Sequence, residues 1–122
     1  MNKRISILED DPGIREIVTL LLEGEGYDVF SFPNVLSFMA REEAMQPNLY
    51  LLDIKLPDGN GLEVCKVLKS EDKSRPIPVM MMSAHEGVEQ MKINCPADDF
   101  IAKPFDIFDF LARVNQLLAN HQ

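Results

Sequence analysis

The sequence predicts a three-layer α/β fold with a five-stranded parallel sheet, and three observations lead to it. Short apolar runs alternate with longer amphipathic segments along the 122 residues, which is typical of repeated β-α-β units. Three of the apolar runs are nearly continuous rather than alternating, as expected of strands that helices cover on both faces. No linker or change of composition divides the chain, so we expect residues 1–122 to form one domain.

The first strand and the first helix have the clearest signals. Arg4–Glu9 is mostly apolar, and in Pro12–Glu25 apolar residues recur every three or four positions, so that they share one helix face. Asp11 directly before this segment is a favourable helix start. Gly24 and Gly26 indicate where the helix ends.

The middle of the chain predicts two more strands and two more helices. Tyr27–Ser31 is a weaker strand signal, and Pro33 to about Met45 is expected to form the second helix. Asn48–Asp53 is apolar up to its last residue and predicts the third strand. The turn residues of Asp58–Gly61 lead into a third helix, Leu62–Ser70.

The last third of the chain completes the alternation. Val79–Ser83 predicts the fourth strand, and Glu86 to about Ile93 predicts a short fourth helix. Asp98–Ala102 predicts the fifth strand, and Phe105 to about Ala119 the last helix. On that helix we expect Phe108 to pack beneath the shortened fourth helix rather than to face solvent.

Charge and composition exclude several classes of function. Twenty acidic and twelve basic residues give a formal charge of -8, which argues against direct binding to nucleic acids or to anionic membranes. No signal-peptide region is present, and no apolar run approaches the roughly 20 residues of a membrane span. We therefore expect a cytoplasmic protein. Cys65 and Cys95 lack metal-ligand spacing and are expected to be reduced, structural thiols.

Charged and polar residues end four of the five expected strands. The first strand ends in Glu9, Asp10 and Asp11, the third in Asp53, the fourth in Ser83, and the fifth is followed by Lys103. In an open parallel sheet these ends meet at one edge, where ligands bind. Clustered carboxylates repel one another, and a hard cation such as Mg²⁺ would neutralise them through oxygen ligands.

These residue types suit phosphoryl transfer. A metal ion and a lysine can neutralise the oxygens of the transferred group, and a serine hydroxyl can donate a hydrogen bond to it. A carboxylate can act as the nucleophile, and Asp53 is central enough to do so. The simpler interpretation, in which Asp53 only ends a strand, is weaker because an unpaired carboxylate at a buried edge is costly.

Four motifs in the same order give the chain a wider resemblance. They are Leu8–Asp11, Leu51–Gly61, Met82–Ala84 and Ala97–Phe105. Each lies at a strand end, and the similarity that they mark extends over essentially the whole chain. With these motifs the sequence resembles the receiver domain of the bacterial two-component response-regulator family, in particular its single-domain, chemotaxis-type members.

The resemblance implies a fold, a metal and a set of roles. The fold is flavodoxin-like, with strand order 2-1-3-4-5 and five helices. Mg²⁺ is the implied cofactor, and Mn²⁺ is possible in its place. The implied roles are Asp53 as phosphoryl acceptor, Asp10 and Asp11 as metal-site acids with Asp11 the preferred ligand, the Lys55 carbonyl as a further metal ligand, Ser83 and Lys103 as phosphate contacts, and Phe100 as switch residue. The Lys103–Pro104 peptide bond is expected to be cis.

The implied partners are a sensor histidine kinase or a histidine phosphotransfer protein, and a downstream protein target. The domain would be a phosphoacceptor switch for phosphorelay signalling and not an enzyme. A phosphatase with an aspartyl nucleophile typically has an acid where this chain has Lys55, and a flavin site would not tolerate the acids after the first strand. A receiver-like docking module that is never phosphorylated remains an alternative.

Overall fold

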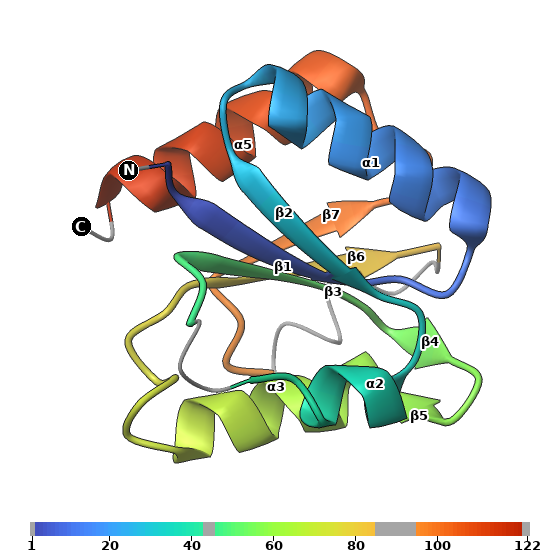
Figure 1. The fold of residues 1–122 in the computed structure, drawn as a ribbon, viewed down its shortest axis with the longest axis vertical. Coiled ribbons are helices and arrows are strands. Elements are labelled where there is room, and N and C mark those ends of the chain that lie inside the picture. The colour runs from blue at the N-terminus through green and yellow to red at the C-terminus, as the bar shows by residue number, and fades with distance from the viewer. Residues whose placement is uncertain (1, 43–45, 85–94, 121–122) are drawn as a thin grey trace.

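A computed structural model describes residues 2–42, 46–84 and 95–120 (Figure 1). Five parallel strands form its central sheet in the order β2-β1-β3-β6-β7. Their bounds are Arg4–Leu8 for β1, Asp28–Phe32 for β2, Leu49–Asp53 for β3, Val79–Ser83 for β6 and Asp99–Ala102 for β7. The predicted strand order is confirmed, since these are the first to fifth parallel strands along the chain.

Helices cover the sheet on both faces (Figure 1). The helices α1 (Pro12–Gly24) and α5 (Ile107–Asn120) lie on one face, and α2 (Val35–Met39) and α3 (Gly61–Ser70) lie on the other. Each face has its own core of buried side chains. All five residues of β3 and of β6 are buried, which explains why these strands have continuous apolar sequences.

The helix α2 is much shorter than predicted, and capping explains both of its ends. The Asn34 side chain accepts a hydrogen bond from the Ser37 amide at 2.8 Å, so the helix begins at Val35 rather than Pro33. After Met39 the Arg41 guanidinium turns back and donates to the Phe38 carbonyl at 2.9 Å. This bond satisfies a carbonyl that a longer helix would have used.

A small antiparallel hairpin follows β3 and was not predicted. It pairs β4 (Lys55–Leu56) with β5 (Gly59–Asn60). The Asp58 carboxylate between them accepts hydrogen bonds from the Val35 and Leu36 amides, at 2.8 and 2.9 Å. A side chain of this turn therefore caps the start of α2, a contact between segments distant in sequence that periodicity cannot show.

The last helix begins later than predicted, and Phe108 is not packed. The Asp106 carboxylate accepts the Asp109 amide at 3.0 Å, which places the helix start at Ile107 rather than Phe105. Phe110 is fully buried, whereas the Phe108 side chain is 82% exposed. Two residues correspond to about 200° around a helix, so both rings cannot face the core. The expectation that Phe108 packs inward was wrong.

The predicted fourth helix, Glu86 to about Ile93, lies outside the described residues. Within the described part of the chain, none of the helices has the length and hydropathy needed to cross a membrane.

Candidate phosphoacceptor site

Asp53 is the last residue of β3, the central strand, and only 7% of its surface is exposed. Its Oδ1 accepts a hydrogen bond from the Ile54 amide at 2.9 Å. The Gly61 amide donates to the Ile54 carbonyl at 2.8 Å, which holds the start of α3 against the end of β3. A Cβ atom at Gly61 would lie 1.9 Å from the Asp53 carbonyl oxygen. Glycine is therefore needed for this close approach.

Lys103 reaches the same place from the end of β7. Its Nζ lies 3.4 Å from Asp53 Oδ2 and also donates a hydrogen bond to Glu9 Oε1. The Lys103 amide donates to the Ser83 carbonyl at 2.7 Å, and the following Lys103–Pro104 bond is cis, as predicted. The backbone therefore delivers the ammonium group to the acids at the centre of the sheet edge.

Glu9 is fully buried beside Asp53. Burial raises the pKa of Glu9 to about 7, the neighbouring Asp53 carboxylate adds to the rise, and the hydrogen bond from Lys103 opposes it. One ammonium group thus faces two carboxylates in a dry environment. The negative charge of the two carboxylates therefore exceeds the positive charge of Lys103, and a further cation would neutralise the remainder.

Glu9, Asp10 and Asp53 together form a candidate metal site. One carboxylate oxygen from each lies within 4.8 Å of the others. Hard oxygen donors of this kind suit Mg²⁺, which commonly uses one or two protein carboxylates and keeps water for its other positions. The three carboxylates supply oxygen ligands for a divalent cation. The raised pKa of Glu9 also fits a cation site, because Lys103 alone does not neutralise all of these acids.

Asp11 caps α1, as its position before Pro12 predicted, but it is not in the acid cluster around Asp53. Its Oδ1 accepts the Gly13 and Ile14 amides, at 2.8 and 3.1 Å, so this side chain is the N-cap of α1. The cluster found among the described residues contains Glu9 and Asp10 in its place. The expectation that Asp11 is the preferred ligand came from the family resemblance, and among three consecutive acids a shift of one residue is easily made.

Glu9 is the member of this candidate site that the sequence reasoning did not assign. It was noted as one of the acids after the first strand but was given no role. The available signal was the nearly continuous apolar run Ile5–Leu8 before it, because a residue that extends a doubly covered strand is buried at the sheet edge. Arg15 of α1 fixes the backbone here by donating to the Glu9 carbonyl at 2.9 Å.

The remaining predicted residues lie at different distances along the chain from Asp53 and differ in burial. Ser83 ends β6 beside Asp53 on β3 and is 2% exposed. Phe100 of β7 is 7% exposed and packs into the core on the α3 side of the sheet. Lys55 begins the hairpin two residues after Asp53, and its side chain is exposed. The structure therefore brings Asp10, Asp53 and Lys103 together, with Ser83 on the adjacent strand.

An apolar groove of about 540 Å³ adjoins Lys103 between α1 and the start of α5. Ile14, Ile17 and Leu21 of α1 form one side of it, and Pro104, Phe105 and Ile107 form the other. Ile17 is 57% exposed although it is apolar. The groove thus offers an accessible hydrophobic surface directly beside the acid cluster.

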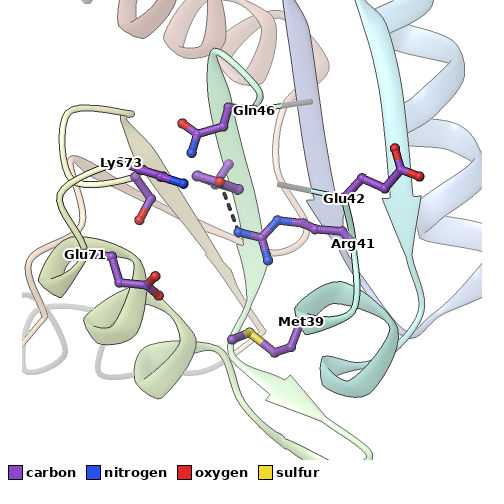
Figure 2. Close-up of a pocket in the computed structure, with 8 residues that line it drawn as sticks. Met39, Arg41, Glu42, Gln46, Glu71 and Lys73 are labelled. Carbon is purple, nitrogen blue, oxygen red and sulfur yellow. Dashed lines mark hydrogen bonds between the residues drawn. The ribbon is translucent and has the colours of Figure 1, made fainter. Parts of the chain in front are cut away.

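A second, much smaller cavity of about 50 Å³ lies away from Asp53, near the start of β3 (Figure 2). Figure 2 shows Arg41 at its centre, with Met39, Gln46 and Lys73 around it. The guanidinium lies 4.2 Å from the centre of the Phe38 ring and donates to the Tyr50 hydroxyl at 3.2 Å. Arg41 therefore connects α2 to β3 through Phe38 and Tyr50. The cavity is large enough only for water molecules.

A parallel α/β sheet with acids and a lysine at its carboxyl edge is the arrangement that the sequence-based resemblance to receiver domains led us to expect. The chain belongs to the response regulator receiver domain family, whose model matches residues 5–115. It is 41% identical to the DNA-binding dual master transcriptional regulator RpaA of Synechocystis sp., over 94% of this chain and 48% of that protein. It is 32% identical to the DNA-binding response regulator MtrA of Mycolicibacterium smegmatis, over 100% of this chain and 53% of that protein.

The solved structures agree with this assignment. The response regulator protein TrrA from Thermotoga maritima, in complex with Mg²⁺-BeF, matches with a TM-score of 0.81 and 26% identity. The match covers 94% of this chain and 98% of that one. The chain spans about half the length of the curated relatives named above. The family match and these similarities show that the chain is a receiver domain of the two-component phosphorelay type.

Proposed function

We propose that this domain accepts a phosphoryl group on the Asp53 carboxylate from a phosphohistidine donor and acts as a phosphorelay switch. The observation that carries the proposal is the position of Asp53 between Lys103 and the acids Glu9 and Asp10. Asp53 ends the central strand, so an incoming group can reach its carboxylate at the open edge of the sheet. The domain acts as a stoichiometric acceptor rather than as an enzyme.

A bound divalent metal would neutralise charge that develops on the transferred group. Glu9, Asp10 and Asp53 would supply its carboxylate ligands, and the Lys55 carbonyl is a further candidate. Mg²⁺ is proposed because all these donors are oxygens, and Mn²⁺ accepts the same donors. The structure of TrrA with Mg²⁺-BeF supports this choice, because beryllium fluoride resembles a phosphoryl group.

The chain's own residues would perform the rest of the chemistry. Asp53 Oδ attacks phosphorus, and the phosphorus–nitrogen bond to the donor imidazole breaks, so the leaving electron pair stays on the donor. Lys103 is already 3.4 Å from Asp53 Oδ2 and would neutralise a phosphoryl oxygen. Ser83 would donate its hydroxyl to another of these oxygens from the adjacent strand end.

Phosphorylation would then shift a conformational equilibrium. The new oxygens attract Lys103 and Ser83, which lie at the ends of β7 and β6. Phe100 is three residues before Lys103 on β7 and is buried, so a shift at Lys103 acts on the strand that holds this ring. A conformation that places Phe100 differently would gain from the phosphate contacts, which is how a ligand biases a two-state system.

The apolar groove beside Lys103 is the proposed docking surface for the phosphohistidine donor. The donor imidazole has to reach Asp53, so its surface must cover the adjoining part of α1 and α5. The partner is a sensor histidine kinase or a histidine phosphotransfer protein, and a further protein receives the output. The receiver family supports a cytoplasmic location. The charge of -8 favours a protein partner over nucleic acid for this domain itself.

Incubation with acetyl phosphate tests the proposal. Wild-type protein should gain about 80 Da in the presence of Mg²⁺ and little in the presence of a chelator. Asp53→Asn should gain nothing, and the matched variant Asp58→Asn should behave as the wild type. A wild-type chain that gains nothing under conditions that phosphorylate another receiver would contradict the proposal and favour the phosphorylation-independent docking module.

A further inference from the structure

On the sheet face that α2 and α3 cover, a small side chain stands between two large ones. Ser6 of β1 is in register with Phe30 of β2 on one side and with Tyr50 of β3 on the other. Tyr50 belongs to the core on this face, and Phe32 packs against it. Alternate residues of a strand point to the same face, so Phe30 lies on it beside Phe32. A serine between two aromatic residues leaves a hollow in this row.

The helix α2 does not fill this hollow. It ends at Met39 after five residues and lies against the β4–β5 hairpin, toward the carboxyl edge of the sheet (Figure 1). An open cavity of about 190 Å³ remains between β1, β2 and the chain that follows α2. The described residues that line it are Ser6, Phe30, Phe32, Arg41 and Glu42.

The Ser6 hydroxyl is the buried polar group of this cavity. Only 3% of the Ser6 surface is exposed, and within residues 2–42, 46–84 and 95–120 its hydroxyl has no hydrogen-bond partner. Every fully enclosed polar side-chain atom in this part of the chain does have a partner. The hydroxyl oxygen is therefore not enclosed by protein and borders the cavity, where a ligand can hydrogen-bond to it.

The two charged residues at the cavity favour neither an anion nor a cation. The Arg41 guanidinium donates to the Phe38 carbonyl at 2.9 Å and to the Tyr50 hydroxyl at 3.2 Å. Figure 2 shows the Glu42 side chain pointing the other way, toward β2, and this residue is exposed. One charge of each sign thus lies at the cavity. Because the whole domain carries a charge of -8, a neutral ligand is favoured over an anion.

We propose that this cavity binds a neutral, single-ring aromatic molecule that carries one hydroxyl group. An apolar cavity of about 150 Å³ is large enough for benzene, so about 190 Å³ accommodates one ring with a small substituent. The half-buried rings of Phe30 and Phe32 would contact the ligand ring, and the Ser6 hydroxyl would hydrogen-bond to its substituent. Phe32 already makes one edge-to-face contact on this side of the sheet, with Phe38 at a centroid separation of 5.5 Å. The site uses neither Asp53 nor Lys103, so it is independent of the proposed phosphoryl transfer.

Titration of ¹⁵N-labelled protein with phenol tests the proposal. Phenol is neutral at pH 7 and combines one ring with one hydroxyl. The amide signals of Ser6, Phe30 and Phe32 should shift along one saturating curve, with a Kd on the order of 1 mM. The signals of Ile17 and Phe105 in the larger groove should not follow that curve, and benzoate should bind at least about tenfold more weakly than phenol. The proposal is overturned if the shifts do not saturate, if they map to the groove, or if benzoate binds as tightly as phenol.

Ser6→Ala and the matched variant Ser31→Ala test the role of the hydroxyl. Ser31 lies on the neighbouring strand β2 and is exposed. Ser6→Ala should bind phenol roughly fivefold more weakly, the effect of one hydrogen bond, but should bind fluorobenzene, which has no hydroxyl, as wild type does. Ser31→Ala should bind both molecules as wild type does. Because the Ser6 hydroxyl has no partner in the described part of the free protein, Ser6→Ala should have the same urea midpoint as wild type or a higher one. A lower midpoint, or an equal loss of affinity for both molecules, would overturn the assignment.

Discussion

Replacing Gly61 by alanine tests how the acceptor residue is positioned, because its direction of effect is opposite to the usual one. Within helices glycine is less favourable than alanine by about 1 kcal/mol, so a Gly→Ala change normally stabilises. At Gly61 the new Cβ would lie 1.9 Å from the Asp53 carbonyl oxygen and 2.9 Å from its carbonyl carbon. Ordinary contact begins near 3.5 Å, so these atoms must separate by roughly 1.5 Å.

No flexible side chain can absorb this movement, because the obstructing atoms belong to the backbone at the end of β3. Insertions of this kind into well-packed regions destabilise by about 1–3 kcal/mol, and occasionally more. We expect Gly61→Ala to lose about 2 kcal/mol of unfolding free energy, which lowers the urea midpoint by roughly 1 M. The shift of Asp53 should also slow its phosphorylation by acetyl phosphate.

Gly24→Ala is the matched control. Gly24 is the last residue of α1, and a Cβ atom there would meet nothing within 4 Å. This variant should be as stable as wild type or more stable by up to about 1 kcal/mol. The close-approach reasoning is refuted if Gly61→Ala unfolds within about 0.5 kcal/mol of wild type, the scatter expected of surface substitutions.

Two further predictions concern the hairpin and the groove. Asp58→Ala should lower the urea midpoint at pH 7, because the hydrogen bonds from the first two amides of α2 lower the pKa of Asp58 and so stabilise the fold. This stabilisation is present above the ordinary carboxyl pKa and is lost as the pH falls through the lowered pKa. A difference in urea midpoint between variant and wild type that stays the same in acid would contradict this reasoning. Ile17→Asp in the groove should slow phosphoryl transfer from a phosphohistidine donor about tenfold (roughly 1.4 kcal/mol) without changing the rate of phosphorylation by acetyl phosphate. Leu20 is similarly exposed on α1 but lies outside the groove, so Leu20→Asp should leave both rates unchanged. Equal effects of the two variants on transfer from the phosphohistidine donor would exclude docking in the groove.

The sequence predicted the fold well because its signals are local and repeated. Continuous apolar runs such as Val79–Ser83 identify doubly covered strands, and the strand order follows from the family resemblance. The bounds of α2 could not be predicted, since they depend on where the Arg41 side chain turns and on a cap that Asp58 supplies from another loop. The buried face of α5 could have been read from Phe110, Val114 and Leu118, which recur every four residues, and Phe108 lies on the opposite side.

The candidate site was predictable to within one residue. Strand ends converge in a parallel sheet, so Asp53 and Lys103 could be paired from sequence, and their separation of 3.4 Å agrees with that reasoning. The sequence also identified Asp11 as the helix cap, but only the structure shows that Glu9 is buried beside Asp53 and that Asp10 joins them in one cluster.

The metal ligands can be separated by a matched pair of variants. Asp10→Asn removes a carboxylate from the cluster around Asp53, whereas Asp11→Asn changes only the cap of α1 and retains an oxygen acceptor. We expect Asp10→Asn to raise the Mg²⁺ concentration needed for phosphorylation at least about tenfold. Asp11→Asn should leave the required Mg²⁺ concentration unchanged. The reverse pattern would show that Asp11, rather than Asp10, is the metal ligand.

Locating the phosphoryl group within the chain tests the central claim most directly. Wild-type protein phosphorylated by acetyl phosphate in Mg²⁺ is reduced with borohydride, which converts an acyl phosphate to an alcohol, and is then mapped by tandem mass spectrometry. The account predicts homoserine at position 53 and at no other aspartate. Modification at any other residue, or an unmodified Asp53 in protein that has gained mass, would contradict it.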